Sequence, residues 1–161
     1  MTDSFVISRV FAASRERMWD AWTVPEQFAA WFGPKGVTTE VLHFDLRPGG
    51  FLHSKVTGPD GAVSWAKSTY DAIDPQSRIV WRQGWANAEG AIIPSPFPMP
   101  WALLMRTEVD FADADGGTRV TVTWTPVDPT DEELTTFKGM FASMSGGWTG
   151  SFDVLEAFLA S

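Results

Sequence analysis

The chain has 161 residues, with 12 basic and 20 acidic side chains, a formal net charge of −8 and no cysteine. Its length fits one domain over residues 1–161, and the missing cysteines exclude disulfides, thiolate nucleophiles and thiolate metal sites. The acidic balance excludes nucleic acid as a partner, because binding to phosphates needs Lys and Arg. No apolar stretch is long enough to cross a membrane and no secretory signal begins the chain, so we expect a cytoplasmic protein without membrane insertion.

The first predicted element is a strand over residues 4–11, which are rich in β-branched and aromatic side chains. Two short helices follow. Ser14 is placed to cap a helix over residues 15–23, because its hydroxyl can accept from a free backbone N–H. Pro25 favours the start of a second helix, which we expect to end near Phe32.

Residues 38–125 alternate in polarity between turn signals, which predicts about six antiparallel strands. A long C-terminal helix is predicted from Asp131 onward, because apolar residues recur at spacings of three and four. Glycines interrupt this helix and predict a bend or a close approach of another segment. These glycines are Gly139, Gly146, Gly147 and Gly150.

Strand registers can be predicted because side chains that face each other should match in polarity. In the middle hairpin, this pairs Tyr70 with Trp81. In the last hairpin, it pairs Phe111 with Thr118. In both hairpins one face is then apolar and the other polar, as expected of an antiparallel sheet with a single covered side.

In the first hairpin, a turn at residues 48–50 would place Asp45 opposite His53, with His43 nearby on the same face. A histidine beside a carboxylate is typical of a general base or a weak metal site. These side chains fall on the polar face, so we interpret them as a solvated cross-strand pair. We predict no catalytic residue, no metal site and no cofactor.

Several motifs, together with this order of elements, are similar to those of a known family. They are Trp31-Phe32-Gly33-Pro34, Asp45-Leu46-Arg47-Pro48-Gly49-Gly50, Ile73-Asp74-Pro75, Gly116-Gly117-Thr118 and Gly147-Trp148. Over residues 4–160 the chain resembles the SRPBCC (START/Bet v 1-like) superfamily, and within it the Activator of Hsp90 ATPase homologue-like domains. The resemblance implies an α+β helix-grip fold. In this fold a curved antiparallel sheet of about six to seven strands wraps a long C-terminal helix, with two short helices after the first strand.

The resemblance also implies a cavity between the sheet and the long helix. Members bind lipids, hormones, polyketides and other apolar molecules, and some are cyclases, hydroxylase components or chaperone cofactors. We therefore expect a small hydrophobic ligand of aromatic, polyketide-like or lipid-like character. One alternative is a cyclase or hydrolase that uses Tyr70 or Gln83. Another is a chaperone-cofactor-like interaction protein, and the chain could form a homodimer.

Aromatic and other inward-facing side chains are the candidate walls of this cavity, since ligand pockets are mainly apolar with a few polar groups. Small residues at positions 66, 68 and 72 would leave room, although the same side chains could instead fill an ordinary core. The candidate ligand-binding residues are Phe44, Ser68, Tyr70, Trp81, Gln83, Trp85, Leu103, Met105, Thr107, Phe141, Met144 and Trp148.

Residues 87–101 carry a proline at every second position from Pro94 to Pro100. Proline fixes φ and donates no hydrogen bond, so this stretch is stiff and extended and cannot pair as a central strand. We interpret it as an ordered lid or interface, and an ordinary long connection is the alternative. The residues expected to touch a ligand or partner are Ile92, Ile93, Phe97 and Met99.

Overall fold

The computed structural model describes residues 4–32 and 36–161, so Gly33 and Pro34 of the Trp31-Phe32-Gly33-Pro34 motif lie outside the described residues. The elements are β1 (Phe5–Phe11), α1 (Arg15–Thr23), α2 (Pro25–Trp31), β2 (Thr38–Phe44), β3 (Phe51–Thr57), β4 (Val63–Asp74), β5 (Arg78–Ala86), β6 (Met105–Ala114), β7 (Gly117–Pro126), α3 (Asp131–Gly139) and α4 (Phe141–Leu159). The strands form one antiparallel sheet in the order β1-β7-β6-β5-β4-β3-β2.

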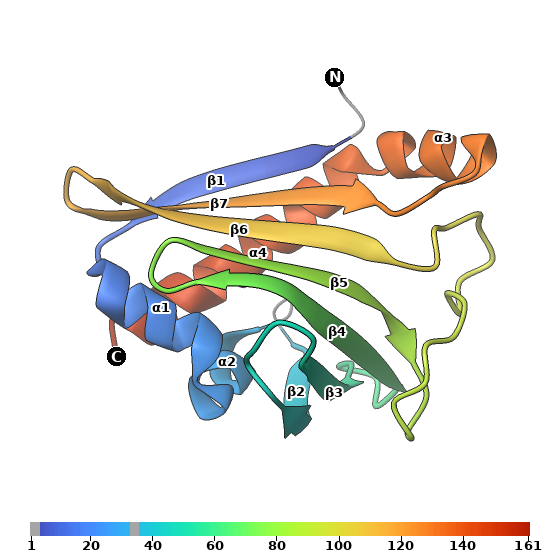
Figure 1. Ribbon diagram of the computed structural model, residues 1–161, viewed down its shortest axis with the longest axis horizontal. Helices are drawn as coiled ribbons and strands as arrows, with labels where there is room; N and C mark the ends of the chain where they lie inside the picture. The colour runs from blue at the N-terminus through green and yellow to red at the C-terminus, as the bar shows by residue number, and fades with distance from the viewer. Residues whose placement is uncertain (1–3, 33–35) are drawn as a thin grey trace.

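Helix α4 runs across one face of this curved sheet, as Figure 1 shows. Both α1 and α2 pack against α4 at one end of the molecule, and α3 lies toward the other end (Figure 1). The predicted α+β architecture is therefore confirmed, including the two short helices after the first strand.

The helix ends follow the capping signals. The Ser14 hydroxyl accepts from the Arg17 backbone N–H at 3.1 Å, and a proline stands at the start of α2. At α3, Thr130 and Glu133 form a reciprocal capping box, in which each side chain accepts from the other's backbone N–H.

The predicted C-terminal helix is two helices, separated at Met140, whose φ of −102° and ψ of 9° leave the helical range. The break directly follows Gly139, so the expected bend is present there. The expected close approach is absent at Gly146, Gly147 and Gly150, because a Cβ added at any of them would meet no atom of another segment within 4 Å. These glycines border open space on the outer side of α4.

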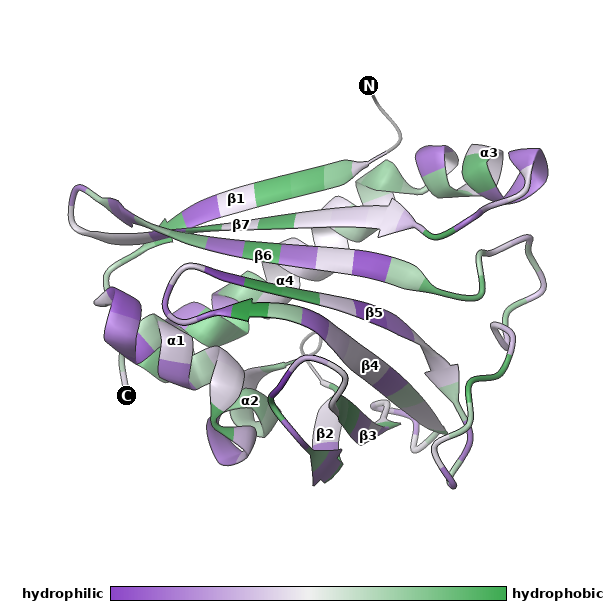
Figure 2. Ribbon diagram, in the orientation of Figure 1, coloured by the Kyte–Doolittle hydropathy of each residue, from purple (hydrophilic) through white to green (hydrophobic). Residues whose placement is uncertain are grey.

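Side chains alternate between the two faces of the sheet, and Figure 2 shows the alternation as hydrophobic and hydrophilic bands along β6. The register of the middle hairpin is confirmed where Tyr70 pairs with Trp81 and Ser68 with Gln83. Beyond that point a bulge at Asp71 shifts the pairing by one residue, so the rest of the predicted hairpin is wrong.

The predicted register of the last hairpin is wrong by two residues. Phe111 pairs with Val120 rather than with Thr118, since the strands continue to Ala114 and Gly117 around a two-residue turn. A shift of two leaves every side chain on its predicted face, because the side-chain period of a strand is two.

The first hairpin also differs from the prediction. Phe44 pairs with Leu52 and His43 with His53, so Asp45 does not lie opposite His53. The reason is that the loop of this hairpin is longer than the predicted turn: the Asp45 N–H donates to the Phe51 carbonyl, and the Gly50 N–H donates to the Arg47 carbonyl within the loop. Gly49 donates to the Tyr70 carbonyl and Gly50 accepts from the Tyr70 N–H, which extends this connection along β4.

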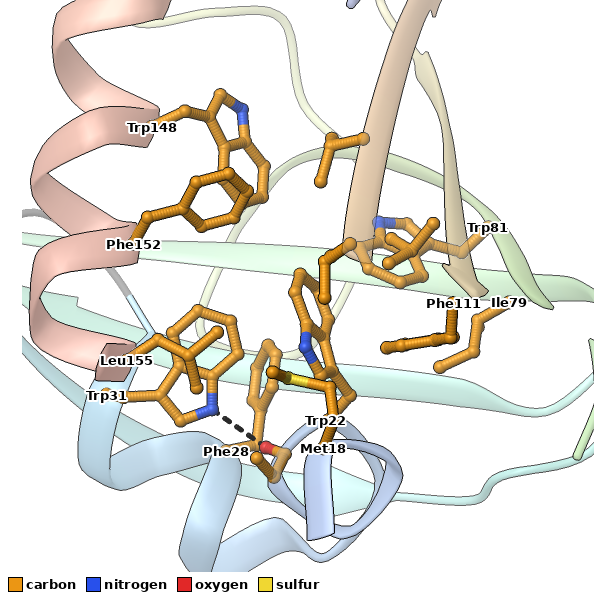
Figure 3. Close-up of a cluster of buried hydrophobic side chains, with 14 of the residues drawn as sticks. Met18, Trp22, Phe28, Trp31, Ile79, Trp81, Phe111, Trp148, Phe152 and Leu155 are labelled. Carbon is orange, nitrogen blue, oxygen red and sulfur yellow. Dashed lines mark hydrogen bonds between the residues drawn. The ribbon is translucent and has the colours of Figure 1, made fainter. Parts of the chain in front are cut away.

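An aromatic cluster forms the centre of the core (Figure 3). Trp22 is 2% exposed, and its ring lies against aromatic rings from α2, β5, β6 and α4. Trp31 packs against Trp22, and its indole N–H donates to the Ala21 carbonyl at 2.8 Å. This buried hydrogen bond connects the two short helices. The cluster therefore holds α1, α2, the sheet and α4 together at one end.

Two glycines should respond oppositely to substitution by alanine. Gly146→Ala should raise the free energy of unfolding by about 0.5–1 kcal/mol, because the methyl group enters open space on a helix. Gly117→Ala should lower it by about 1–3 kcal/mol, because φ is +156° and a Cβ would collide with the Phe11 carbonyl oxygen. Urea unfolding of the two variants measures both changes, and a stabilised Gly117→Ala protein would contradict this account of the β1–β7 contact.

Candidate functional site

A cavity of about 340 Å³ lies between the sheet and the beginning of α4. Its floor is the inner face of the sheet, where the lining residues are Leu52, Ser54, Ala66, Ser68, Trp81, Gln83, Gly84, Trp85, Met105 and Trp124. The opposite wall comes from the short helices and from the α3–α4 junction, with Phe28, Phe32, Met140 and Met144. This volume is at the small end of the range of about 300–1,000 Å³ that is typical of ligand pockets.

The Pro-rich connection forms the mouth of the cavity. Ser95, Phe97, Met99, Trp101, Ala102 and Leu103 line it. Phe97 and Leu103 are each 52% exposed, and the Phe97 ring packs on Trp85 at 5.5 Å between ring centroids. Apolar side chains at the mouth therefore face both solvent and the interior.

Gly84 is a position where the end of this connection lies close against the sheet. A Cβ at Gly84 would lie 2.7 Å from the Leu103 carbonyl oxygen and 3.2 Å from a side-chain carbon of Leu104. The missing side chain therefore lets the backbone at residues 103–104 lie directly on β5.

The main polar group in the wall is the Gln83 side-chain amide. Its carbonyl oxygen accepts from the Trp81 indole N–H and, at 2.8 Å, from the Thr107 hydroxyl. These two bonds fix the orientation of the amide, since an indole N–H can only donate. The other polar side chains in the wall are the serines at positions 54, 68 and 95.

No charged residue of the described chain lines the cavity. Both arginines of β5 form ion pairs: Arg82 binds Asp71 of β4 at 2.9 Å, and Arg78 binds Asp110 of β6 at 2.7 Å. Hydrogen bonding to these carboxylates raises the pKa of both guanidinium groups above its ordinary value. Such surface pairs contribute little to stability. The inner face of the sheet is uncharged because side chains alternate between the two faces of each strand and these charged residues lie on the outer one.

Nine of the residues predicted for the cavity or its lid line this cavity. They are Ser68, Trp81, Gln83, Trp85, Phe97, Met99, Leu103, Met105 and Met144. The sequence pattern could find most of them because alternate residues of β4, β5 and β6 share one face.

The other predicted residues do not line the cavity. Three of them belong to the sheet: Phe44, Tyr70 and Thr107. Phe44 and Tyr70 pack together with ring centroids 6.2 Å apart, and neither lines the cavity. Tyr70 is buried, and burial raises the pKa of its hydroxyl above the usual range. Thr107 is fully buried and holds Gln83 instead of lining the cavity itself.

The other predicted residues that do not line the cavity come from α4 and from the Pro-rich connection, and they make contacts elsewhere. Phe141 packs against Phe5 and Phe137, and Trp148 belongs to the aromatic cluster around Trp22. Ile92 forms an isolated bridge with Ala86, and the Ile93 N–H donates to the Trp85 carbonyl. These bonds attach the first part of the connection to the end of β5.

Several lining residues were not predicted. Phe28 lies in α2 and Phe32 directly follows it. Their spacing of four residues is typical of one helix face, but it does not show that this face lines the cavity. Trp124 could have been found, because it shares a strand face with buried Val122. Trp101 and Ala102 lie outside regular structure, where no periodicity could place them.

The histidines form no metal site. His53 is 7% exposed, and its Nε2 lies 3.1 Å from the Asn87 carbonyl oxygen, so it is not the solvated residue that we predicted. Asp45 pairs with Arg47 at 2.7 Å instead. Within residues 4–32 and 36–161, no group of three or more His, Cys, Asp or Glu side chains could hold a metal ion.

None of the described helices is both long enough and apolar enough to cross a membrane.

Known structures share this architecture over nearly the whole chain. Protein Ms6760 from Mycobacterium smegmatis is 27% identical with a TM-score of 0.79, over 98% of this chain and 91% of that one. A protein from Arthrobacter aurescens is 23% identical with a TM-score of 0.80, over 98% and 86% of the two chains. The AHSA1 protein from Silicibacter pomeroyi is 17% identical with a TM-score of 0.73, over 98% and 97%.

The comparison with curated proteins found no match. A family model, described as Activator of Hsp90 ATPase homolog 1-like protein, matches residues 12–160. Since the match spans both the sheet and α4, the chain belongs to the Activator of Hsp90 ATPase homolog 1-like family, whose fold is that of the SRPBCC superfamily.

Proposed function

We propose that this protein binds a small, neutral, hydrophobic molecule in the cavity between the sheet and α4. The observation that carries the proposal is a cavity of about 340 Å³ whose walls hold aromatic and methionine side chains and no charged group among the described residues. Burial of apolar ligand surface would supply the affinity, at roughly 25 cal/mol per Å² before the costs of association.

The lining favours a ligand with aromatic, polyketide-like or lipid-like character. Indole and phenyl rings offer flat surfaces for stacking, as with Trp81, Trp85 and Phe28. The methionines at positions 99, 105, 140 and 144 are flexible and polarizable, so they can adapt to ligands of different outline. Phe97 and Met99 would form the lid over a bound molecule.

A catalytic function has less support at this cavity. The two residues considered for a cyclase or hydrolase were Tyr70 and Gln83, and only Gln83 lines the cavity. An amide is neither an acid nor a base near neutral pH, so it can orient a molecule but cannot transfer its proton. Binding, rather than a named reaction, is therefore the function we propose.

A pair of fluorescent probes tests the neutral character of the site. N-phenyl-1-naphthylamine is neutral, and 1-anilinonaphthalene-8-sulfonate has a similar ring system with a sulfonate. We expect the neutral probe to bind at least about tenfold more tightly, because a buried anion would have no cation beside it. Fluorescence titration measures both dissociation constants. Tighter binding of the sulfonate would contradict the proposal, as would binding of neither probe.

A substitution that fills the cavity should remove binding without unfolding the protein. Ala66→Leu adds bulk to the floor between Ser54 and Trp85, and we expect at least a tenfold loss of affinity for N-phenyl-1-naphthylamine. Ala112→Leu is the matched control, because Ala112 is exposed on β6 and lies outside the cavity. Circular dichroism verifies folding of both variants. Equal affinities in the two variants would place the probe elsewhere on the protein.

A further inference from the structure

The wall of the cavity contains a hydrogen-bond donor that no protein group satisfies. Trp124 is one of the residues that line the cavity. Its indole Nε1 is buried and has no hydrogen-bond partner among the described residues. An indole N–H has no alternative to donation, and a buried donor without an acceptor is destabilising. Groups of this kind are uncommon in folded proteins and require an explanation.

A second donor lies on the same face of the sheet. The Gln83 carbonyl is occupied by Trp81 and Thr107, so the free hydrogen-bonding group of the amide is its Nε2. No hydrogen bond within the described residues uses that nitrogen. Gln83 therefore offers N–H groups, and no acceptor, to anything that enters the cavity.

The sheet register places these two donors on the same face of the sheet, two strands apart, with β6 between them. Trp81, Thr107 and Trp124 occupy adjacent positions across β5, β6 and β7, and Gln83 is the next inward residue along β5. All four side chains share the inner face of the sheet. An indole donor and an amide donor, both without a partner among the described residues, thus lie on one face of a mainly apolar wall.

The buried indole of Trp22 provides a contrast. Its Nε1 also has no partner among the described residues, but Trp22 does not line the cavity and is enclosed by the aromatic cluster. No ligand in the cavity could accept from it. Of the two buried indoles without a partner among the described residues, only that of Trp124 belongs to a residue that lines the cavity.

We propose that the ligand is a neutral aromatic or polyketide-like molecule with a carbonyl oxygen that accepts from Trp124 Nε1, while Gln83 Nε2 offers a second donor to another part of the molecule. A carboxylate is disfavoured because no cationic side chain lines the described wall. This inference rests on the proposed function, because it assigns the polar group of a molecule bound in the same cavity.

Fluorenone and fluorene form a suitable test pair, because they share one flat ring system and differ by a carbonyl group. Displacement of N-phenyl-1-naphthylamine gives both dissociation constants. We expect fluorenone to bind on the order of 2- to 12-fold more tightly than fluorene, as one net hydrogen bond would give. Trp124→Phe should abolish this preference while keeping an aromatic floor, and Trp101→Phe, which changes another lining indole, should retain it.

The wild-type protein gives an independent measurement if Trp124→Phe does not fold. In a ¹⁵N NMR titration, fluorenone should move one indole N–H resonance downfield, and fluorene should leave that resonance near its original position. Equal affinities for the two compounds, or a preference that persists in folded Trp124→Phe, would overturn the inference and leave the proposed function standing. Failure of both compounds to bind would overturn the proposed function as well.

Discussion

The attachment of α4 to the sheet through the aromatic cluster is the constraint on which the rest of the structure depends. Trp148 stacks on Trp22 at 6.3 Å between ring centroids, and Phe152 and Leu155 are almost completely buried one and two turns further on. Burial of large apolar side chains is the main stabilising contribution in a domain of this size. The packing of this helix is therefore concentrated in its C-terminal half, where α1 and α2 also meet it.

The cavity is a consequence of that uneven packing. Met140 and Met144, at the beginning of α4, contribute to the cavity wall, whereas the later turns of the helix are closed over by aromatic rings. Because the helix breaks at Met140, α4 begins at this end as a helix separate from α3. This arrangement is compatible with binding, because a movement at the mouth, near the beginning of α4, need not disturb the aromatic cluster that covers its later turns.

Much of the architecture was predictable because hydrophobic periodicity and capping residues are local signals. The sides on which Ser68, Gln83 and Met105 lie followed from strand alternation, and an error of two residues in register could not reverse them. The bulge at Asp71 and the pairing of Gly49 with Tyr70 were not predictable, since both depend on contacts between strands rather than on local sequence. The cavity wall was found only in part, because the segment containing Trp101 has no periodicity.

Charge connects the composition of the chain to the character of the cavity. The net charge of the chain is −8, yet none of the charged residues that the structure describes lines the cavity, and ion pairs such as Arg82–Asp71 lie outside it. An acidic exterior slows the approach of anions by long-range repulsion. An uncharged interior then gives an anion no partner once it has entered. Both effects disfavour anionic lipids and acids, so the electrostatics of the whole protein and the chemistry of its cavity wall agree with the neutral ligand that we propose.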